Sequence, residues 1–590
     1  MVGHPRHAHP RDVACGHALP RAPEVRDARD RRRRDQGVTM GGYLKTVGQD
    51  LVDEDARIVR LRGVGIGNWL LPEGYMWRLP APADRPRRIE DLIVDLIGED
   101  EARRFWQCYR DRFISETDIA DLAAAGFNSL RLPLNARTIL SADGVIASDG
   151  LIEFDEAEIA RVDRLIGWCR ESGVYVILDL HGAPGGQTGT NIDDSRDDQP
   201  ELFQCGAHAD LTVALWRSLA LRYADEWIVA GYDLLNEPLP EWFSRYNPMV
   251  LPLYRRITEA IRSVDRRHAI ILEGVHWATD WSIFTERIDD NLMLEFHKYW
   301  NNPDRESLAP YLAKRESWKV PIFMGEGGEN NTDWYTGAFG LYDDLEISWN
   351  FWTWKKMDTT NSPLSIRPPA GWSRVAQAAA LRPTHAPRIP HDQAVEIFRE
   401  YAENVASERC DHHAEVVGAL FRRAPLRVPA IFYVNAERGV GFDSPHSVPR
   451  DQTPRFRAGD RMPMVFVGRE RMPTLCRESP DFRHGGGEPW SPDQWIGVRL
   501  DPGAWTTYTV VILASGPYRI DGWCRADEAA SLLISTDTPG TEVSCDVGAA
   551  DDAWSCALEF GEGSRRITVR CREGSLFLIA ITVGSVSKGV

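Results

Sequence analysis

The chain has 590 residues, of which 43% are hydrophobic and 10% aromatic, and its formal net charge at pH 7 is −18. This length exceeds what one hydrophobic core normally organises, so we expect two domains. The acidic balance argues against nucleic acid or an anionic membrane as the main partner. No apolar run reaches the 18 residues that would predict a membrane span.

Residues 1–39 hold nine arginines against five acidic residues, with several prolines and no apolar periodicity, so we expect a disordered Arg-rich tail. The run Arg31–Arg34 could be a basic localisation patch or a twin-arginine export signal, but no apolar segment follows it. We favour Met40 as the true start of translation, in which case residues 1–39 correspond to nucleotide sequence upstream of the start codon. The cytoplasm is then the expected compartment, and a misassigned start leaves export open.

The ten cysteines are scattered and include no CxxC pair, which predicts buried thiols rather than metal ligands. Five of them follow residue 470, so a disulfide there is compatible with an exported protein. No metal and no other cofactor is predicted, and the sequence indicates no oligomeric state.

From about residue 57 to 380, short apolar runs alternate with amphipathic segments such as 155–173 and 211–225. Near-continuous apolar strands separated by helices predict a parallel sheet covered on its faces. Eight such units close a (β/α)₈ barrel, which we assign to residues 40–426 with a helical extension over 391–425. The expected strands are 58–66, 127–134, 174–182, 228–237, 268–275, 291–299, 320–327 and 345–354.

Polar and ionisable residues end six of these strands. In such barrels the active site is built at the carboxyl ends of the strands. A barrel with a purely structural role has no need of so many polar strand ends. They are Arg131, His181, Asn236 with Glu237, His297 with Tyr299, Glu326, and Trp352 or Trp354.

Glu237 and Glu326 end the fourth and seventh strands and should face each other across one bowl. Two such carboxyl groups, one protonated and one ionised, can cleave a glycosidic bond, and direct attack on the sugar needs a spacing of about 5 Å. Asn236 can bind a sugar hydroxyl, plausibly the 2-OH, while Arg131 and Tyr299 can hold Glu326 as an anion. The alternative for any one of these residues is an ion pair that closes the end of the barrel.

These residues resemble glycoside hydrolase family 5, the cellulase-like retaining β-glycosidases. The resemblance covers residues 43–380 and follows the family's order. It implies that Glu237 is the acid/base, Glu326 the nucleophile and Trp352 a sugar platform. The matching stretches are LRLP with Arg131, DLHGAPGGQTG with His181, LLNEP with Asn236 and Glu237, EFHKY with His297 and Tyr299, MGEGG with Glu326, and ISWNFWTWK with Trp352.

Two stretches, GNWLLPEGY (67–75) and HGAPGGQTG (181–189), are similar to the exo-acting β-1,3-glucanases of that family. The resemblance implies that Glu73 binds hydroxyls of the terminal sugar; simple exposure after a turn is the alternative. The chain departs from this subgroup at Gly327-Gly328, where an aromatic residue usually follows the nucleophile, and at Lys298. These departures leave the identity of the sugar open.

The implied function is a retaining β-glycosidase, exo-acting on β-glucosides or β-1,3-linked gluco-oligosaccharides. A β-mannosidase or an endo-β-glucanase on the same scaffold is the alternative. From other classes, a catalytically inactive sugar-binding protein and a structural partner protein are the rival hypotheses. The expected partner is a small-molecule or oligosaccharide β-glycoside.

Residues 427–590 show period-two alternation between Gly, Pro and Asp turns, which predicts an antiparallel β-sandwich. Segments 428–442 and 505–520 resemble carbohydrate-binding modules of families 6 and 35. Their opening usually carries a Glu-Asp pair, whereas this chain has Ile431-Phe432, so we expect a structural or weakly binding module. Sugar platforms or core residues are the alternatives for Trp490, Trp495, Trp505, Trp523 and Trp554.

Three other features of the sequence give weaker indications of function. Glu273 could serve a sugar subsite or a structural ion pair. Segment 191–198 is acidic but lacks the spacing of a calcium loop, so a solvated loop is expected. Trp277 and Trp281 are expected at the rim of the leaving-group subsite.

Overall fold

A computed structural model describes residues 42–141, 144–299, 301–381, 389–446, 456–466, 496–526, 528–549 and 551–586. The predicted tail, Met40, Trp490 and Trp495 lie outside these residues. None of the helices described there has the length and apolarity needed to cross a membrane.

Eight parallel strands close into a barrel in which β11 pairs with both β10 and β4. This confirms the predicted barrel, although several strands are shorter than the apolar runs that indicated them. The core strands β5 and β6 are buried on both faces, which explains their continuous apolar sequences. The strands are β4 (Arg62–Gly65), β5 (Ser129–Asn135), β6 (Tyr175–Gly182), β7 (Val229–Asp233), β8 (Ala269–Glu273), β9 (Leu292–His297), β10 (Ile322–Gly328) and β11 (Ser348–Trp352).

Helices cover the outside of the barrel, and local signals set their ends. Helix α5 (Glu156–Ser172) begins after Asp155, whose carboxylate accepts hydrogen bonds from the Ala157 and Glu158 backbone N–H groups. It ends at Gly173, which adopts a φ of 70°. The other covering helices are α3 (Glu116–Ala124), α6 (Gly206–Tyr223), α7 (Asn247–Arg262), α9 (Ala309–Trp318) and α10 (Thr332–Asp344).

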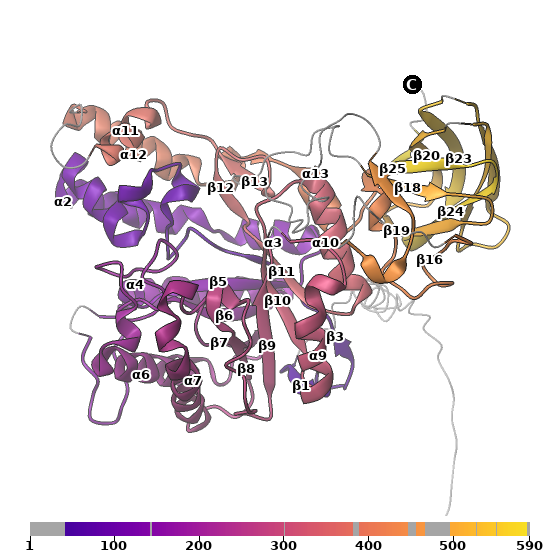
Figure 1. Ribbon diagram of the computed structural model, residues 1–590. Helices are drawn as coiled ribbons and strands as arrows, with labels where there is room; N and C mark the ends of the chain where they lie inside the picture. The colour runs from indigo at the N-terminus through magenta and orange to yellow at the C-terminus, as the bar shows by residue number, and fades with distance from the viewer. Residues whose placement is uncertain are drawn as a thin grey trace, which may run out of the picture.

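A helical group packs beside the barrel and includes α2 (Pro86–Phe113), α11 (Trp372–Ala380) and α12 (His391–Asn404) (Figure 1). Its core is aromatic: Trp77 lies against Tyr401 and Tyr109, with ring centroids 4.6 and 5.2 Å apart. Two small sheets, β1 (Lys45–Val47) with β2 (Asp50–Val52) and β3 (Ile58–Val59), and β12 (Lys355–Met357) with β13 (Leu364–Ile366) and β14 (Asp411–His412), complete this part of the chain.

Two antiparallel sheets form the C-terminal sandwich, which lies beside the barrel in Figure 1. This confirms the predicted fold class. The alternation predicts strands at 494–501, 506–513, 518–525, 530–536, 565–571 and 575–583. It does not predict β22, β23 or the short strands β15, β16 and β17. The first sheet contains β17 (Met464–Phe466), β18 (Ile496–Leu500), β25 (Leu576–Ser585), β20 (Gly516–Arg525), β23 (Ala553–Phe560) and, paired to β25, β15 (Leu426–Pro429). The second contains β16 (Phe442–Asp443), β19 (Trp505–Ile512), β24 (Gly563–Glu573), β21 (Ala530–Thr536) and β22 (Glu542–Val547).

The sandwich is joined to the barrel by helix α13 (Ala414–Leu420) and by packing on α10. The Phe432 ring lies so close to Gly337 of α10 that an added Cβ would meet it at 2.7 Å. Arg427 forms a salt bridge with Asp333, and Ile431 and Phe432 are buried. Ile431 and Phe432, which stand where the resemblance led us to expect a Glu-Asp pair, therefore lie in the buried core next to the barrel.

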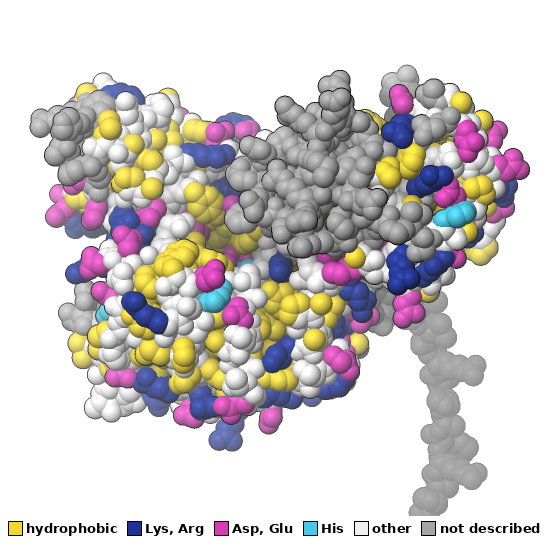
Figure 2. Space-filling view, viewed as in Figure 1, with side chains coloured by type: hydrophobic (Ala, Val, Ile, Leu, Met, Phe, Trp, Pro, Cys, Tyr) yellow, Lys and Arg dark blue, Asp and Glu magenta, His cyan; other side chains and the backbone are white. Residues whose placement is uncertain are grey.

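Figure 2 shows one face of the molecule, on which hydrophobic side chains gather over the barrel. Charged side chains of both signs are spread along the barrel's lower edge and over the sandwich in this view.

Candidate active site

A cavity of about 690 Å³ opens at the carboxyl ends of the barrel strands. Seven of the nine predicted site residues line it, while Arg131 and Asn236 lie beneath and contact the lining residues. The full lining is Glu73, Tyr75, His181, Asn191, Ile192, Glu237, Trp277, Thr279, His297, Lys298, Tyr299, Asn301, Glu326, Glu329 and Trp352.

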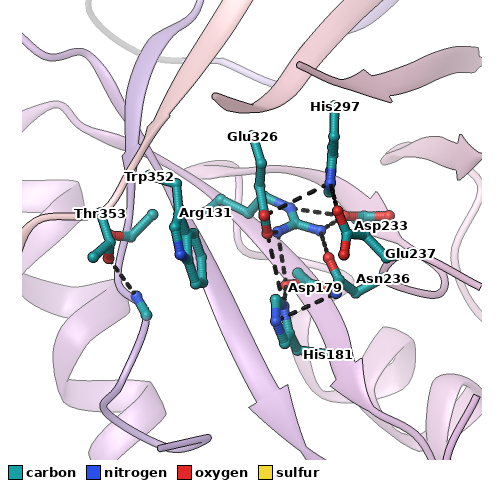
Figure 3. A network of polar contacts seen from close by, with 12 residues as sticks. Arg131, Asp179, His181, Asp233, Asn236, Glu237, His297, Glu326, Trp352 and Thr353 are labelled. Carbon is teal, nitrogen blue, oxygen red and sulfur yellow. Dashed lines mark hydrogen bonds and ion pairs between the residues drawn. The ribbon is translucent and has the colours of Figure 1, made fainter. Parts of the chain in front are cut away.

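Arg131, on β5, lies at the centre of a buried network and is 0% exposed (Figure 3). Its Nη1 donates to Oε1 of Glu326 at 2.6 Å, and its Nη2 donates to Oδ1 of Asn236 at 2.9 Å. Its Nη2 also donates to Oδ2 of Asp233 at 2.6 Å and to Oε1 of Glu273 at 2.8 Å. These contacts show Glu273 in a buried ion pair, the structural one of its two interpretations.

Glu326, on β10, is held by donors on both carboxylate oxygens. Arg131 donates to Oε1, and the Tyr299 hydroxyl donates to Oε2 at 2.7 Å. The side chain is nearly buried yet lines the cavity. A positive charge and two hydrogen bonds favour the ionised carboxylate, which is the form a nucleophile requires.

Glu237 follows β7 and has a different environment. Its Oε1 lies 2.7 Å from Nδ1 of His297, and its backbone N–H donates to Oε2 of Glu273 at 2.7 Å. Burial raises the pKa of Glu237 to about 7, although His181 and Arg131 oppose this shift. The raised pKa favours a protonated carboxyl group near neutral pH, the form a proton donor requires.

The carboxyl groups of Glu237 and Glu326 approach each other closely: ligand atoms of these residues and of His297 all lie within 4.8 Å of one another. The two strand ends thus bring to one cavity a carboxyl group whose pKa is raised by burial and a second one that accepts hydrogen bonds from a guanidinium and a hydroxyl. Such a pair can donate a proton to a leaving alcohol and attack the carbon that it leaves.

His181, on β6, is positioned by Asp179 and by an aromatic neighbour. Its Nδ1 lies 2.7 Å from Oδ2 of Asp179, and its Nε2 lies 3.3 Å from Nδ2 of Asn236. The imidazole stacks on the Trp352 ring with centroids 5.4 Å apart. Burial lowers the pKa of His181 to about 4, so the ring is neutral at pH 7.

Trp352 ends β11 and forms one wall of the cavity. Its Nε1 donates to the Tyr75 hydroxyl at 3.1 Å, and its ring packs so closely on Gly67 that an added Cβ would meet it at 2.5 Å. The next residue, Thr353, donates to the Gly65 carbonyl at 2.8 Å. Trp354 lies elsewhere: its Nε1 donates to Asp118 in the core at 3.0 Å.

Glu73 is 3% exposed, so the alternative of a solvent-exposed side chain is wrong. Burial, and then the nearby charges of Glu326, Glu329 and Glu237, raise the pKa of Glu73 well above its usual value. Glu329, which also lines the cavity, forms a salt bridge of 2.7 Å with Lys356. This wall therefore presents a dense set of groups that can bind sugar hydroxyls.

Of the two tryptophans expected at the rim of the cavity, only one lies there. Trp277 lines the cavity and has a φ of 62°, within a run of three residues of positive φ from His276 to Ala278. Its ring lies 5.9 Å from that of Trp242, which is 65% exposed. Trp281 does not reach the rim, because it is buried and donates from Nε1 to the Glu295 carbonyl.

The acidic segment 191–198 is a solvated loop only in part: residues 196–198 are exposed, as expected, whereas residues 193–195 are buried. Asp193 and Asp194 are buried, and Oδ2 of Asp193 accepts from the backbone N–H groups of Thr188 and Gly189. Asp193 thus serves as a turn-forming acceptor in the loop that brings Asn191 to the cavity, whereas Asp194 forms salt bridges with Arg87 and Arg137.

Four buried acidic residues belong to the network around Arg131 but were not predicted as site residues. Three of them were not recognised, and the fourth, Glu273, was left with two interpretations. Asp179, Asp233 and Glu295 lie inside apolar strands at inward positions, and Glu273 ends β8. A carboxylate inside an otherwise apolar strand was the available signal, since isolated buried charges are rarely tolerated without a partner.

Two groups of ionisable residues are compact enough for a metal ion, namely Glu237, His297 and Glu326, and Glu273, Glu295 and His297. In both, the acidic side chains already contact Arg131, His297 or Tyr299. The guanidinium provides the positive charge that an ion would bring, so we assign no metal ligand among the described residues.

Comparisons with known proteins agree with this geometry. Residues 98–358 match the family model Cellulase (glycosyl hydrolase family 5). A beta-xylosidase from Phanerodontia chrysosporium is 32% identical over 264 residues, which are 44% of this chain and 52% of the relative. A probable glucan 1,3-beta-glucosidase A from Aspergillus fumigatus is 30% identical over 248 residues, 40% of this chain and 55% of the relative.

The chain therefore spans about half the length of these curated relatives. Among solved structures, the endoglucanase Cel5A from Thermotoga maritima aligns with a TM-score of 0.35 and 20% identity, over 50% of this chain and 89% of that chain. The family match covers most of the barrel, including Glu237, Glu326 and their partners. Residues 98–358, which form most of the barrel, therefore match a cellulase domain of glycosyl hydrolase family 5.

Proposed function

We propose that the chain is a retaining, exo-acting β-glycosidase that releases a terminal sugar from β-glucosides or β-1,3-linked gluco-oligosaccharides. The observation that carries this proposal is the close approach of Glu237 and Glu326 within one cavity. Retaining enzymes place their two carboxyl groups about 5 Å apart, whereas inverting enzymes need about 6.5–9.5 Å to accommodate a water molecule.

In the first step Glu326 attacks the anomeric carbon and forms a glycosyl ester. Glu237 donates its proton to the glycosidic oxygen, and the leaving alcohol departs. The environments fit these roles, since Arg131 and Tyr299 stabilise the Glu326 anion while burial favours protonated Glu237. Asn236, held by Arg131, is placed beside Glu237 to bind the sugar's 2-OH.

In the second step water attacks the anomeric carbon from the face that the alcohol left. Glu237, now ionised, accepts a proton from this water, and the bond between the sugar and Glu326 breaks. Arg131 and Tyr299 again stabilise the carboxylate of Glu326 as it leaves. Two inversions give a product with the configuration of the substrate.

The exo-acting part of the proposal is supported by the wall that Glu73, Tyr75 and Trp352 form. Glu73 is buried, lines the cavity and sits on the polypeptide segment that precedes a short helix at Gly74–Trp77. A carboxyl group and an aromatic face together suit the hydroxyls and the apolar face of one terminal sugar. Trp277 and Trp242 then lie toward the leaving group.

A β-xylosidase is the second candidate, because the similar Phanerodontia chrysosporium protein carries that name. Xylose lacks the hydroxymethyl group of glucose, so the two activities differ in how the cavity accommodates one substituent. Comparing kcat/KM for 4-nitrophenyl β-glucoside, β-xyloside and β-mannoside separates the candidates and the expected alternative of a β-mannosidase.

The test of the proposal is a panel of aryl β-glycosides and β-linked disaccharides, with the anomeric configuration of the first product followed by NMR. We expect a β-configured first product, loss of turnover in Glu326→Gln and weakened turnover in Glu237→Ala. An α-configured first product would refute the retaining mechanism. No turnover of any glycoside by the wild-type chain would favour the sugar-binding or structural protein instead.

A further inference from the structure

His297 links the acid/base Glu237 to a buried carboxyl group on the far side of its ring. Nδ1 of His297 lies 2.7 Å from Oε1 of Glu237, while Nε2 lies 3.2 Å from Oε1 of Glu295 and 3.6 Å from Oε1 of Glu273. Burial lowers the pKa of His297 to about 3. The ring is therefore neutral, with one N–H donor and one nitrogen lone pair.

The chemistry of Glu237 decides which nitrogen carries the hydrogen. To protonate a leaving alcohol, Glu237 must hold its proton on the oxygen that faces the substrate, so Oε1 must accept from His297. Nδ1 is then the donor, and Nε2 presents its lone pair to Glu295 and Glu273. A lone pair facing two unprotonated carboxylate oxygens is repulsive, so one of the two carboxyl groups must donate a hydrogen bond.

The contacts of the two carboxyl groups identify the donor. Both oxygens of Glu273 already accept hydrogen bonds, Oε1 from Arg131 at 2.8 Å and Oε2 from the Glu237 backbone N–H at 2.7 Å. Oε1 of Glu295 lies 3.4 Å from Nε of Arg131, and its Oε2 is buried without a hydrogen-bond partner among the described residues. The proton therefore belongs on Oε1 of Glu295.

The charges around Glu295 favour the same assignment. Arg131 of β5 is a single guanidinium in contact with five carboxyl groups, and it cannot offset five negative charges in a site removed from water. Burial, and then the charge of Asp233, raise the pKa of Glu295 well above its usual value. The groups that face Glu295 are Arg131 of β5, Asp179 of β6, Asp233 of β7, Glu273 of β8, His297 of β9 and Glu326 of β10.

We propose that Glu295 is a positioning residue that stays protonated throughout the reaction. Its O–H donates to Nε2 of His297, which fixes the tautomer whose Nδ1–H points at Oε1 of Glu237. Glu295 neither gains nor loses a proton in either step: the proton that Glu237 delivers leaves from its other oxygen and is replaced from water. This inference rests on the proposed acid/base function of Glu237.

Two substitutions of similar size test whether Glu295 acts as a hydrogen-bond donor or only fills its volume in the packed site. In Glu295→Gln the amide N–H still donates to Nε2, whereas Glu295→Met has no donor. For an alkyl β-glycoside, whose departure needs the acid, we expect kcat/KM to stay within about fivefold of wild type in the Gln variant and to fall at least about tenfold in the Met variant.

Two further measurements are the pH dependence of kcat/KM and its dependence on the leaving group. Neither should change if Glu295 has a purely structural role. Without the donor, Nε2–H of His297 turns to Glu273 and Nδ1 accepts from Glu237, so the alkaline limb of kcat/KM should move to higher pH in Glu295→Met only. The 2,4-dinitrophenyl β-glycoside needs no acid, and its kcat/KM should change by less than about threefold in both variants.

A direct measurement on the wild-type protein covers the case in which Glu295→Met does not fold. In ¹⁵N NMR of histidine-labelled enzyme, the His297 signals, assigned by their loss in His297→Asn, should show a protonated Nδ1 and an unprotonated Nε2. A protonated Nε2 would overturn the inference. So would a Gln variant as impaired as Met, or a Met variant with wild-type leaving-group and pH dependence. Absence of wild-type turnover would instead refute the proposed function.

Discussion

Glu237 and Glu326 are chemically identical side chains that lie close together in opposite electrostatic environments. Glu326 accepts hydrogen bonds from Arg131 and Tyr299 on both of its oxygens. Glu237 contacts a neutral imidazole, and burial raises its pKa to about 7. A pair of carboxyl groups whose environments favour different protonation states is what general acid catalysis and nucleophilic attack require together.

The raised pKa of Glu237 gives the first prediction. In the proposed mechanism the protonated form of Glu237 is the reactive one. On that basis kcat/KM for an alkyl β-glycoside should fall as pH rises through about 7, by about tenfold for each further pH unit. With a 2,4-dinitrophenyl leaving group, which needs no proton, this decline should be absent. A decline that begins near pH 4, where an unperturbed glutamate ionises, would contradict the assigned environment of Glu237.

Tyr299 gives a second prediction at this scale. Its hydroxyl donates to Oε2 of Glu326, and hydrogen bonds to charged groups contribute about 1.5–3 kcal/mol. Tyr299→Phe should therefore lower kcat/KM by about tenfold to a hundredfold while the thermal unfolding midpoint changes little. Unchanged kinetics in a folded variant would show that Arg131 alone holds the nucleophile.

The elements that carry the site place its side chains by close packing as well as by hydrogen bonds. Trp352, at the end of β11, rests on the backbone after β4, where Gly67 leaves room for the ring. Gly67→Ala should displace Trp352, because the new Cβ would meet the ring at 2.5 Å. We expect kcat/KM to drop by at least about tenfold from this misplacement.

Gly206→Ala, on α6, is the matched control, because a Cβ there meets no atom within 4 Å. Near-UV circular dichroism and intrinsic fluorescence would report the altered tryptophan environment in Gly67→Ala and not in the control. Equal kinetics in the two variants would mean that the position of Trp352 does not matter for turnover.

Comparison of sequence and structure shows which elements are predictable. The barrel strands were recognisable because burial on both faces leaves continuous apolar runs, and the polar strand ends located the cavity. Asp179, Asp233 and Glu295 were not recognised as one network, since only the closed barrel brings these inward positions together around Arg131. Trp281 was placed at the rim wrongly, because spacing does not reveal which of two nearby tryptophans turns inward.

In the sandwich, β22 and β23 were missed for a related reason. Both are edge strands, and polar or small residues interrupt their apolar positions. The exposed positions of β22 carry glutamate, serine and aspartate, and those of β23 carry alanine, serine and glutamate. A strand covered on one face offers a weaker sequence signal than one buried on two. The pattern therefore predicted the architecture of the sandwich better than its number of strands.

At the scale of the whole molecule, the sandwich and the barrel share a buried contact at α10. Phe432 is 3% exposed and packs against Gly337, so Phe432→Ala should lower the free energy of unfolding by about 3–5 kcal/mol. Calorimetry should then resolve two unfolding transitions in this variant, whereas we expect a single coupled transition in the wild type. The kinetic constants at 25 °C should not change, since Phe432 lies outside the cavity lining.

Phe560→Ala is the control, since this buried residue packs on Tyr518 inside the sandwich. This substitution should lower the free energy of unfolding of the sandwich. It leaves the contact with α10 intact, so the unfolding transitions of the barrel and the sandwich should not separate. Loss of activity in Phe432→Ala at temperatures where the barrel remains folded would contradict this division of roles and would indicate that the sandwich contributes to the site.

The central claim is that Glu326 attacks the sugar while Glu237 assists the leaving group. It is tested most directly by incubating the enzyme with a 2,4-dinitrophenyl 2-deoxy-2-fluoro-β-glycoside and identifying the labelled peptide by mass spectrometry. This account predicts one sugar bound covalently to Glu326, with no label in Glu326→Gln. A label on another residue would contradict it, as would turnover of ordinary substrates with no covalent intermediate and an α-configured first product.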